Sequence, residues 1–194
     1  MSPEIRLPGG IIIPEQALAK EAKIKLRASA HIAMGRHDLE LKRVREGPYR
    51  ELWSRLRKSA DPIPPDVLWE EGTEFFPLIA KAKKESSDKS RSLARYLSGV
   101  WNGLLDVRRA YVGELGNLSR LPIGDGVLDK QNLIEQLATS EANLILTRNG
   151  YPSIDQKKVI DPEYYLGKVY ATEHALGRMD HIPTRIPPVP QYLC

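Results

Sequence analysis

Residues 88–115, DKSRSLARYLSGVWNGLLDVRRAYVGEL, carry the strongest hydrophobic pattern in the chain and decide its fold class. From Leu93 to Leu115, apolar residues keep the three- and four-residue spacing of one helix face, which predicts a core helix. The other side is small and polar and includes Gly99, Gly103 and Gly113. Because each glycine costs a helix about 1 kcal/mol relative to alanine, three of them predict close approach of another backbone, from protein or ligand.

Proline positions show where the other helices can run. The windows 15–47, 78–121, 123–151 and 163–182 contain no proline, and proline breaks helix interiors. The first window is rich in Ala, Leu, Lys, Glu and Arg, which are good helix formers. Its apolar residues form two thin edges rather than one stripe, which suits contacts with several neighbours better than one core.

The ends of the later helices have local signals. Asp66 is a candidate cap for a helix over 66–84, although Pro77 makes a single straight helix doubtful there. Asp161, followed by proline and glutamate, is a strong helix start, with Gly177 as its stop.

A further helix is expected between two turn signals. It runs from a cap at Asp129 to about Arg148, where Asn149-Gly150 would end it. The alternative places a strand at 143–147, with Asn149-Gly150 as a hairpin turn.

The expected fold is all-α, with a bundle of about four helices, a long basic N-terminal helical arm and an extended proline-rich C-terminal tail. The expected divisions are an extended segment at 1–14, the arm at 15–60, the bundle core at 61–150, a C-terminal helix region at 151–182 and the tail at 183–194.

Composition bounds the class of protein. A chain of 194 residues is long enough for one domain with its own core. The single cysteine, Cys194, excludes a disulfide framework and a cysteine-ligated zinc site within one chain. No apolar run reaches the roughly 18 residues of a membrane span, and the N-terminus does not resemble a secretory signal. Five asparagines and five glutamines are few, which favours a thermophilic source.

Charge is distributed unevenly along the chain. Residues 15–60 hold twelve basic and six acidic residues, residues 61–80 hold five acids and no base, and residues 81–120 hold nine bases and four acids. Such basic segments suit the phosphates of a nucleic acid, although lysine and arginine also simply solvate a surface helix. The candidate nucleic-acid-binding residues are Lys20, Lys23, Lys25, Arg27, Lys42, Arg43, Arg45, Arg50, Arg55, Arg57, Lys58, Arg95 and Arg109.

Motifs for catalysis are absent from the sequence. It contains no glycine-rich phosphate loop, dinucleotide fingerprint, paired metal-binding histidines or Gly-x-Ser-x-Gly. The adjacent pairs Glu173-His174 and Asp180-His181 are typical of surface neighbours rather than of an acid–base couple. We therefore expect no enzyme activity, cofactor, metal or small-molecule substrate.

In 108–138, a helix ending RRAYVGELGN is followed by a Pro/Gly interval and an apolar helix. This order of elements resembles the major coat proteins of rod-shaped and filamentous archaeal double-stranded DNA viruses. The resemblance implies a virion nucleocapsid protein whose arm wraps the DNA backbone and which assembles with copies of itself or a homologous subunit. DNA versus RNA, homo- versus hetero-assembly and the presence of an envelope stay open. Outside a virus, we expect an intracellular location.

A second resemblance is to the helical domain of the GINS replication-scaffold subunits. The stretch YRELWSRLRKSADPIPPDVLWEE, followed by a helix ending LLDVRRAYV, is similar to their helix, proline-marked loop and long helix with paired arginines. This resemblance implies a non-catalytic replication-scaffold subunit, a pattern in which the basic arm has no counterpart. The other alternative is a non-catalytic helical subunit of another large protein complex, in which the basic arm binds a protein partner.

Overall fold

The computed structural model describes residues 4–7, 11–14, 26, 63–112, 127–128, 130–154, 160–190 and 193. The described part contains four helices: α4 (Pro65–Lys84), α5 (Asp88–Ala110), α6 (Lys130–Arg148) and α7 (Pro162–Ala175). The expected mostly-α bundle is therefore confirmed. Apart from the buried Leu26, the predicted arm at 15–60 lies outside the described residues.

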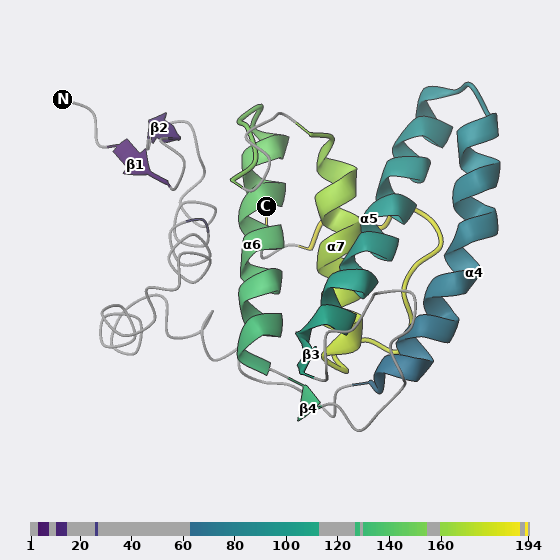
Figure 1. The fold of residues 1–194 in the computed structure, drawn as a ribbon. Coiled ribbons are helices and arrows are strands. Elements are labelled where there is room, and N and C mark those ends of the chain that lie inside the picture. The colour runs from purple at the N-terminus through teal and green to yellow at the C-terminus, as the bar shows by residue number, and fades with distance from the viewer. Residues whose placement is uncertain are drawn as a thin grey trace.

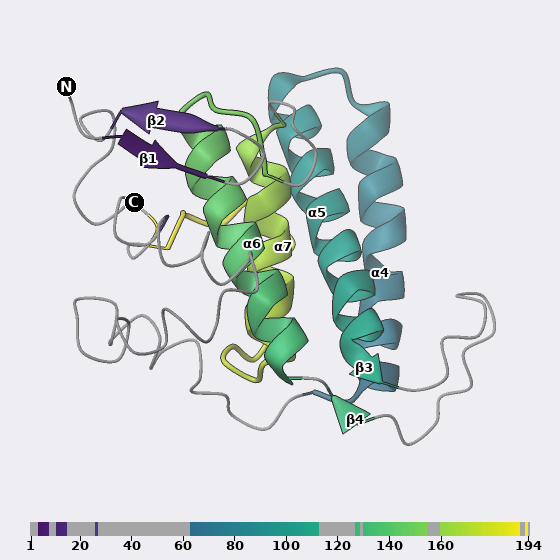
Figure 2. The same cartoon turned by 60° about the vertical axis from the view of Figure 1, so that its left-hand side comes forward.

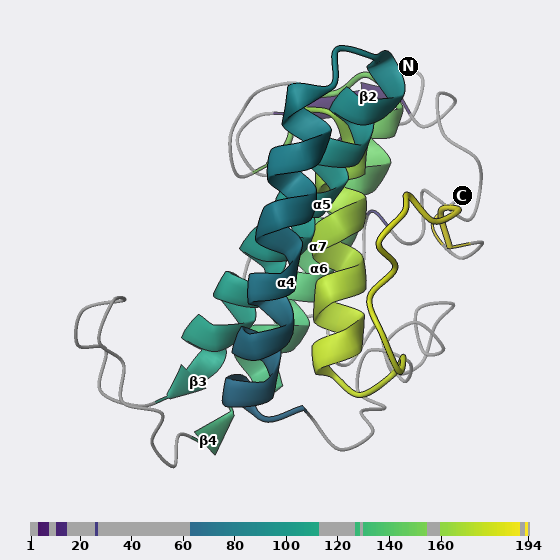
Figure 3. The same ribbon diagram turned by 90° about the vertical axis from the view of Figure 1, so that its right-hand side faces the viewer.

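The helices lie side by side in the order α4, α5, α7, α6 (Figure 1). A connection over residues 85–87 turns α4 back along α5, and α7 returns along α6. As a result α5 and α7, which are far apart in the sequence, pack against each other in the middle of the bundle (Figure 3).

Glycines make the contact between α5 and α7 possible. A Cβ atom at Gly99 would collide with the backbone carbonyl of Tyr164, and one at Gly167 would collide with the backbone of α5. One helical turn further on, a Cβ at Gly103 would lie 2.7 Å from the Cβ of Ala171. The predicted backbone approach at Gly99 and Gly103 is confirmed, and the approaching backbone is that of α7.

Two short antiparallel strand pairs accompany the helices. β1 (Glu4–Arg6) pairs with β2 (Ile12–Pro14), and the buried Ile5 and Ile13 of this hairpin join the main core cluster beside α6 (Figure 2). β3 (Tyr111–Val112) pairs with β4 (Val127–Leu128). The helix predicted over 88–115 therefore ends earlier, at Ala110, because the chain leaves α5 to form this pairing.

Glycines in the left-handed region end two helices. Gly150, with φ 77°, follows α6, and the N–H groups of Gly150 and Tyr151 donate to the carbonyls of Thr147 and Leu146. This glycine-terminated helix end rules out the strand alternative at 143–147. Gly177, with φ 68°, closes α7 in the same way, as predicted.

Two expectations about α4 were wrong. The helix continues through Pro77, which lies on the exposed side of α4, so its ring does not disturb the packing of the core. Asp66 lies at the second helical position rather than at the cap. The helix begins at Pro65, whose fixed φ suits a first turn where the N–H needs no helical partner.

Residues 183–190 of the proline-rich segment lie along the bundle (Figure 3). The hydroxyl of the fully buried Tyr96 donates to the carbonyl of Pro183 at 3.0 Å, and that of Tyr170 donates to the carbonyl of Pro188 at 3.0 Å. Val189 packs against the core between these anchors and the chain end.

Replacement of Gly99 by alanine tests the contact between α5 and α7. The added methyl group collides with the rigid backbone of α7, so we expect a loss of at least about 2 kcal/mol in the free energy of unfolding. Ser92→Ala, on the same helix, is the matched control and should change the free energy by less than about 0.5 kcal/mol. Urea unfolding of both variants makes the comparison, and equal midpoints would contradict the close contact.

Alkaline pH tests the burial of Tyr96. Burial raises the pKa of the Tyr96 hydroxyl, and the neighbouring Tyr170 raises it further. The unfolded state then loses this proton near pH 10 while the folded state keeps it, so stability is retained below pH 10 and falls above it. We expect Tyr96→Phe to remove up to about 1.4 kcal/mol per pH unit of this slope, measured as unfolding free energy between pH 9 and 11. An unchanged slope would contradict the assignment.

Candidate phosphate-binding surface

Six exposed basic residues surround the connection between α4 and α5. Residues 81–95 hold six basic and two acidic residues, for a net charge of +4, and all eight are exposed. We call the six cations the basic turn. They are Lys81, Lys83, Lys84, Lys89, Arg91 and Arg95.

Local chemistry explains why the chain turns here. Lysines in the last turn of α4 interact favourably with the negative end of the helix dipole. At the start of α5, the hydroxyl of Ser87 accepts the N–H of Ser90 at 3.1 Å, and the Ser90 hydroxyl donates to Glu85 at 2.5 Å. These bonds tie the short connection to the start of α5, so the cations at the end of α4 and at the start of α5 lie on either side of it.

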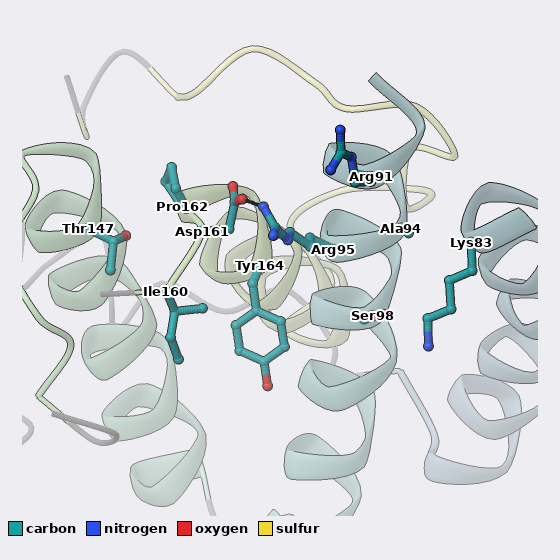
Figure 4. Close-up of a pocket in the computed structure, with 10 residues that line it drawn as sticks. All are labelled: Lys83, Arg91, Ala94, Arg95, Ser98, Thr147, Ile160, Asp161, Pro162 and Tyr164. Atoms are coloured by element: carbon teal, nitrogen blue, oxygen red, sulfur yellow. Dashed lines mark ion pairs between the residues drawn. The ribbon is translucent and has the colours of Figure 1, made fainter. Parts of the chain in front are cut away.

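Part of the basic turn lines an open cleft of about 770 Å³ between the ends of α4 and α6 and the starts of α5 and α7 (Figure 4). We call it the basic cleft. Its polar groups come from all four helices, so their proximity depends on the packing of the bundle. The lining residues are Lys83, Arg91, Ala94, Arg95, Ser98, Thr147, Ile160, Asp161, Pro162 and Tyr164.

The charge of the basic cleft is positive. Arg95 forms an ion pair with Asp161, directly before α7, and Arg91 pairs with the exposed Asp88 at 2.5 Å. An exposed pair such as Arg91–Asp88 holds its cation weakly. Lys83 makes no ion pair with another described residue. Among the described lining residues, three cations against one carboxylate suit a phosphate or another small anion.

The structure locates two of the thirteen candidate residues from the sequence. Arg95 lies in the basic cleft, and Arg109 lies on α5, with its side chain outside the described part. The eleven candidates between Lys20 and Lys58 lie outside the described residues. Five cations of the basic turn were not named as candidates, although the regional charge of 81–120 contained their signal.

A second exposed feature is a row of aromatic rings across α4 and α5. The ring of Trp101 lies 4.2 Å from that of Phe76 and 5.4 Å from that of Trp69, measured between centroids. Gly72 leaves room for it, since a Cβ there would lie 3.0 Å from the Trp101 ring. The guanidinium of Arg108 lies 4.4 Å above the ring of Trp69. We call Trp69, Phe76 and Trp101 the aromatic ridge.

His174 is buried, contrary to the expectation of a surface position. Its Nδ1 lies 2.8 Å from the carbonyl oxygen of Met179, and its Nε2 lies 2.6 Å from a carboxylate oxygen of Glu71. Its neighbour Glu173 is also buried and pairs with Arg178 at 2.9 Å. The His174–Glu71 contact therefore links α7 to α4. The described residues contain no group of three or more His, Cys, Asp or Glu side chains placed to hold a metal ion.

Comparison with known proteins found no matching family model, no similar curated protein and no similar solved structure. Within the described part of the chain, none of the helices has the length and apolar character needed to cross a membrane.

The charge of residue 161 tests the basic cleft. Asp161→Asn removes the one acid among the described residues that line it, while asparagine remains a favourable residue before a helix. We expect inorganic phosphate to bind about fivefold more tightly, the effect of one charge removed at about 4 Å in water. Amide chemical shifts of residues 83–98 and 160–164 would report the titration. Arg95→Gln should weaken binding, and equal affinities in both variants would contradict an anion site.

Proposed function

We propose that this protein is a non-catalytic structural protein that coats double-stranded DNA by binding its phosphate backbone without sequence preference. The observation that carries the proposal is the basic turn, in which six exposed cations lie within fifteen residues of an ordered helix hairpin. Base readout requires side chains directed at a groove, whereas a compact group of cations suits phosphates.

Counterion release supplies the binding energy in this proposal. Each phosphate neutralised by a lysine or arginine releases condensed cations, so the affinity falls steeply with salt. The basic residues of 15–60 add to this surface, with Lys23, Arg27, Lys42 and Arg45 as the first to test. No cofactor or metal takes part, and no small molecule is turned over.

Coating a long duplex also requires contacts between protein copies. We propose that copies of this chain, or this chain and a homologous subunit, assemble side by side along the DNA. The archaeal virus coat proteins provide the comparable architecture, and the location that follows is the virion nucleocapsid.

The aromatic ridge favours a second candidate function. Exposed aromatic side chains are enriched at protein–protein interfaces, and a scaffold subunit of the GINS kind would use them to bind a different protein. Such a subunit should form a small oligomer of fixed size and bind DNA poorly. A coat protein should bind long duplexes cooperatively and form filaments.

Neutralisation of two lysines tests the proposed function. Lys84→Gln with Lys89→Gln should lower the slope of log affinity against log salt by up to about 2, since each phosphate contact on B-DNA contributes about 0.9. Fluorescence anisotropy with a long random-sequence duplex at several salt concentrations measures the slope, and a duplex RNA in parallel shows which nucleic acid is preferred.

The matched control removes the same charge elsewhere. Arg148→Gln with Arg185→Gln changes two exposed cations outside the basic turn and should leave the slope near that of the unchanged protein. If both pairs lower the slope equally, overall charge rather than the basic turn determines binding. If the unchanged protein binds no duplex at low salt, the proposed function is wrong.

A further inference from the structure

Two stripes of side chains run along the seam between α4 and α5. The members of each stripe are spaced seven residues apart, which is nearly two helical turns, so each stripe lies along one side of its helix. Because the connection at 85–87 makes the two helices antiparallel, the stripes meet in reverse order. They consist of Trp69, Phe76 and Lys83 on α4 and of Ala94, Trp101 and Arg108 on α5.

Contacts join the two stripes into one surface. At one end, Lys83 lines the basic cleft beside α5 (Figure 4). In the middle, the ring of Phe76 lies 4.2 Å from that of Trp101, and at the other end the guanidinium of Arg108 lies 4.4 Å above the ring of Trp69. The aromatic ridge is therefore continuous with the basic cleft, has a cation at each end and extends for about 21 Å along α4.

The rings of the ridge are exposed on a side of α4 that its glutamates do not share. Phe76 is 47% exposed and Trp69 is 37% exposed, so much of their surface faces solvent. The acids that follow the first turn of α4 are Glu70, Glu71 and Glu74. At 100° per residue, they lie at least about 100° around the helix from both rings. The acidic charge of α4 is thus directed away from the aromatic ridge.

The charge beside the rings is positive. Arg108 makes no ion pair with another described residue. The acid closest to it in the sequence, Asp106, pairs with Lys168 of α7 at 2.6 Å. An exposed aromatic surface with a cation at each end suits an anion that also carries flat, apolar groups.

The seam is too well filled to hold such a ligand inside it. The crevice beside Trp69 and Arg108 has a volume of about 10 Å³, which is room for about one water molecule. A ligand must therefore lie across the rings rather than between them. Flat groups that stack on exposed rings, joined by a repeating negative charge, are the bases and phosphates of a single-stranded nucleic acid.

Other partners fit this surface less well. In a duplex the bases are stacked on each other and are not accessible to a protein ring unless they are extruded. A protein segment would need acidic and flat apolar side chains in alternation, whereas every nucleotide supplies both groups. The chemistry of the aromatic ridge therefore favours an unpaired strand.

We propose that the aromatic ridge binds single-stranded nucleic acid, with bases stacked on its exposed rings and phosphates held by Arg108 and by Lys83 at the edge of the basic cleft. In a coating protein, this site holds unpaired stretches of the genome. Binding there requires bases, whereas the proposed coating of a duplex requires only phosphates. The two proposals can therefore fail separately.

A strand without bases tests the proposal on the unchanged protein. Fluorescence anisotropy compares a labelled thymidine oligonucleotide of about 12 nucleotides, a usual length for domains that stack bases, with an abasic strand of the same length and charge. We expect the full chain to bind the thymidine strand at least about tenfold more tightly, because stacking contributes only where bases are present. Equal affinities would overturn the proposal.

Substitutions on the two stripes separate stacking from charge. Phe76→Ala should weaken binding of the thymidine strand at least about fivefold, the effect of one lost stack, and leave abasic and duplex binding unchanged. Val67→Ala is the matched control, because Val67 is 39% exposed on the opposite side of α4, and it should change neither. Arg108→Gln should lower the salt slope for the thymidine strand by about 0.7, the contribution of one phosphate on a single strand. Circular dichroism and thermal unfolding confirm that each variant remains folded.

Two further results would overturn the proposal. Equal weakening by Phe76→Ala and Val67→Ala would show that the aromatic ridge does not stack bases. Tighter binding of a peptide of about 12 residues with alternating glutamate and leucine, lost in Phe76→Ala, would show that the ridge is a protein interface. A chain that binds the thymidine strand through Phe76 but binds no duplex would contradict the coating function and support this inference.

Discussion

The approach of α5 to α7 through Gly99 and Gly167 is the constraint on which the rest of the bundle depends. A backbone atom of each helix occupies the space that a side chain would need on the other, so a larger residue at either glycine would force the two helices apart. This contact holds Arg95 of α5 beside Asp161 at the start of α7, and it brings Tyr96 to the carbonyl of Pro183. The basic cleft and the path of the proline-rich segment both follow from it.

The outer helix, α4, is attached to this centre by its inner side. Trp101 packs over Gly72, and the buried His174 binds Glu71 from the other direction. With its inner side fixed, α4 presents acidic and aromatic groups along its first part and lysines at its end. In the proposed function, the lysine end of α4 contacts the phosphate backbone, whereas its acidic first part repels it.

Sequence reasoning succeeded where the determinant was local. Apolar spacing predicted α5, the glycines at 99 and 103 predicted a close backbone, and Gly150 and Gly177 marked helix ends because a positive φ is a property of one residue. It failed where the determinant was a distant partner: nothing near His174 indicated burial against Glu71, which is 103 residues away, and nothing near Ala110 indicated that strand pairing ends the helix there. The candidate site could likewise be predicted only in part. Regional charge indicated a basic segment, but only the packing of α7 and α6 against α5 shows which cations share a cleft.

Hydrogen–deuterium exchange of the full chain, with and without a long random-sequence duplex, tests the central claim most directly. The non-helical amides at 85–87 lie within the basic turn, whereas the first turns of α4 carry acids and no base. At protein concentrations below self-association, the account predicts that DNA slows exchange at 85–87 and at the adjoining ends of α4 and α5, and leaves residues 67–76 unchanged. Slower exchange at 67–76 with no change at 85–87 would contradict it.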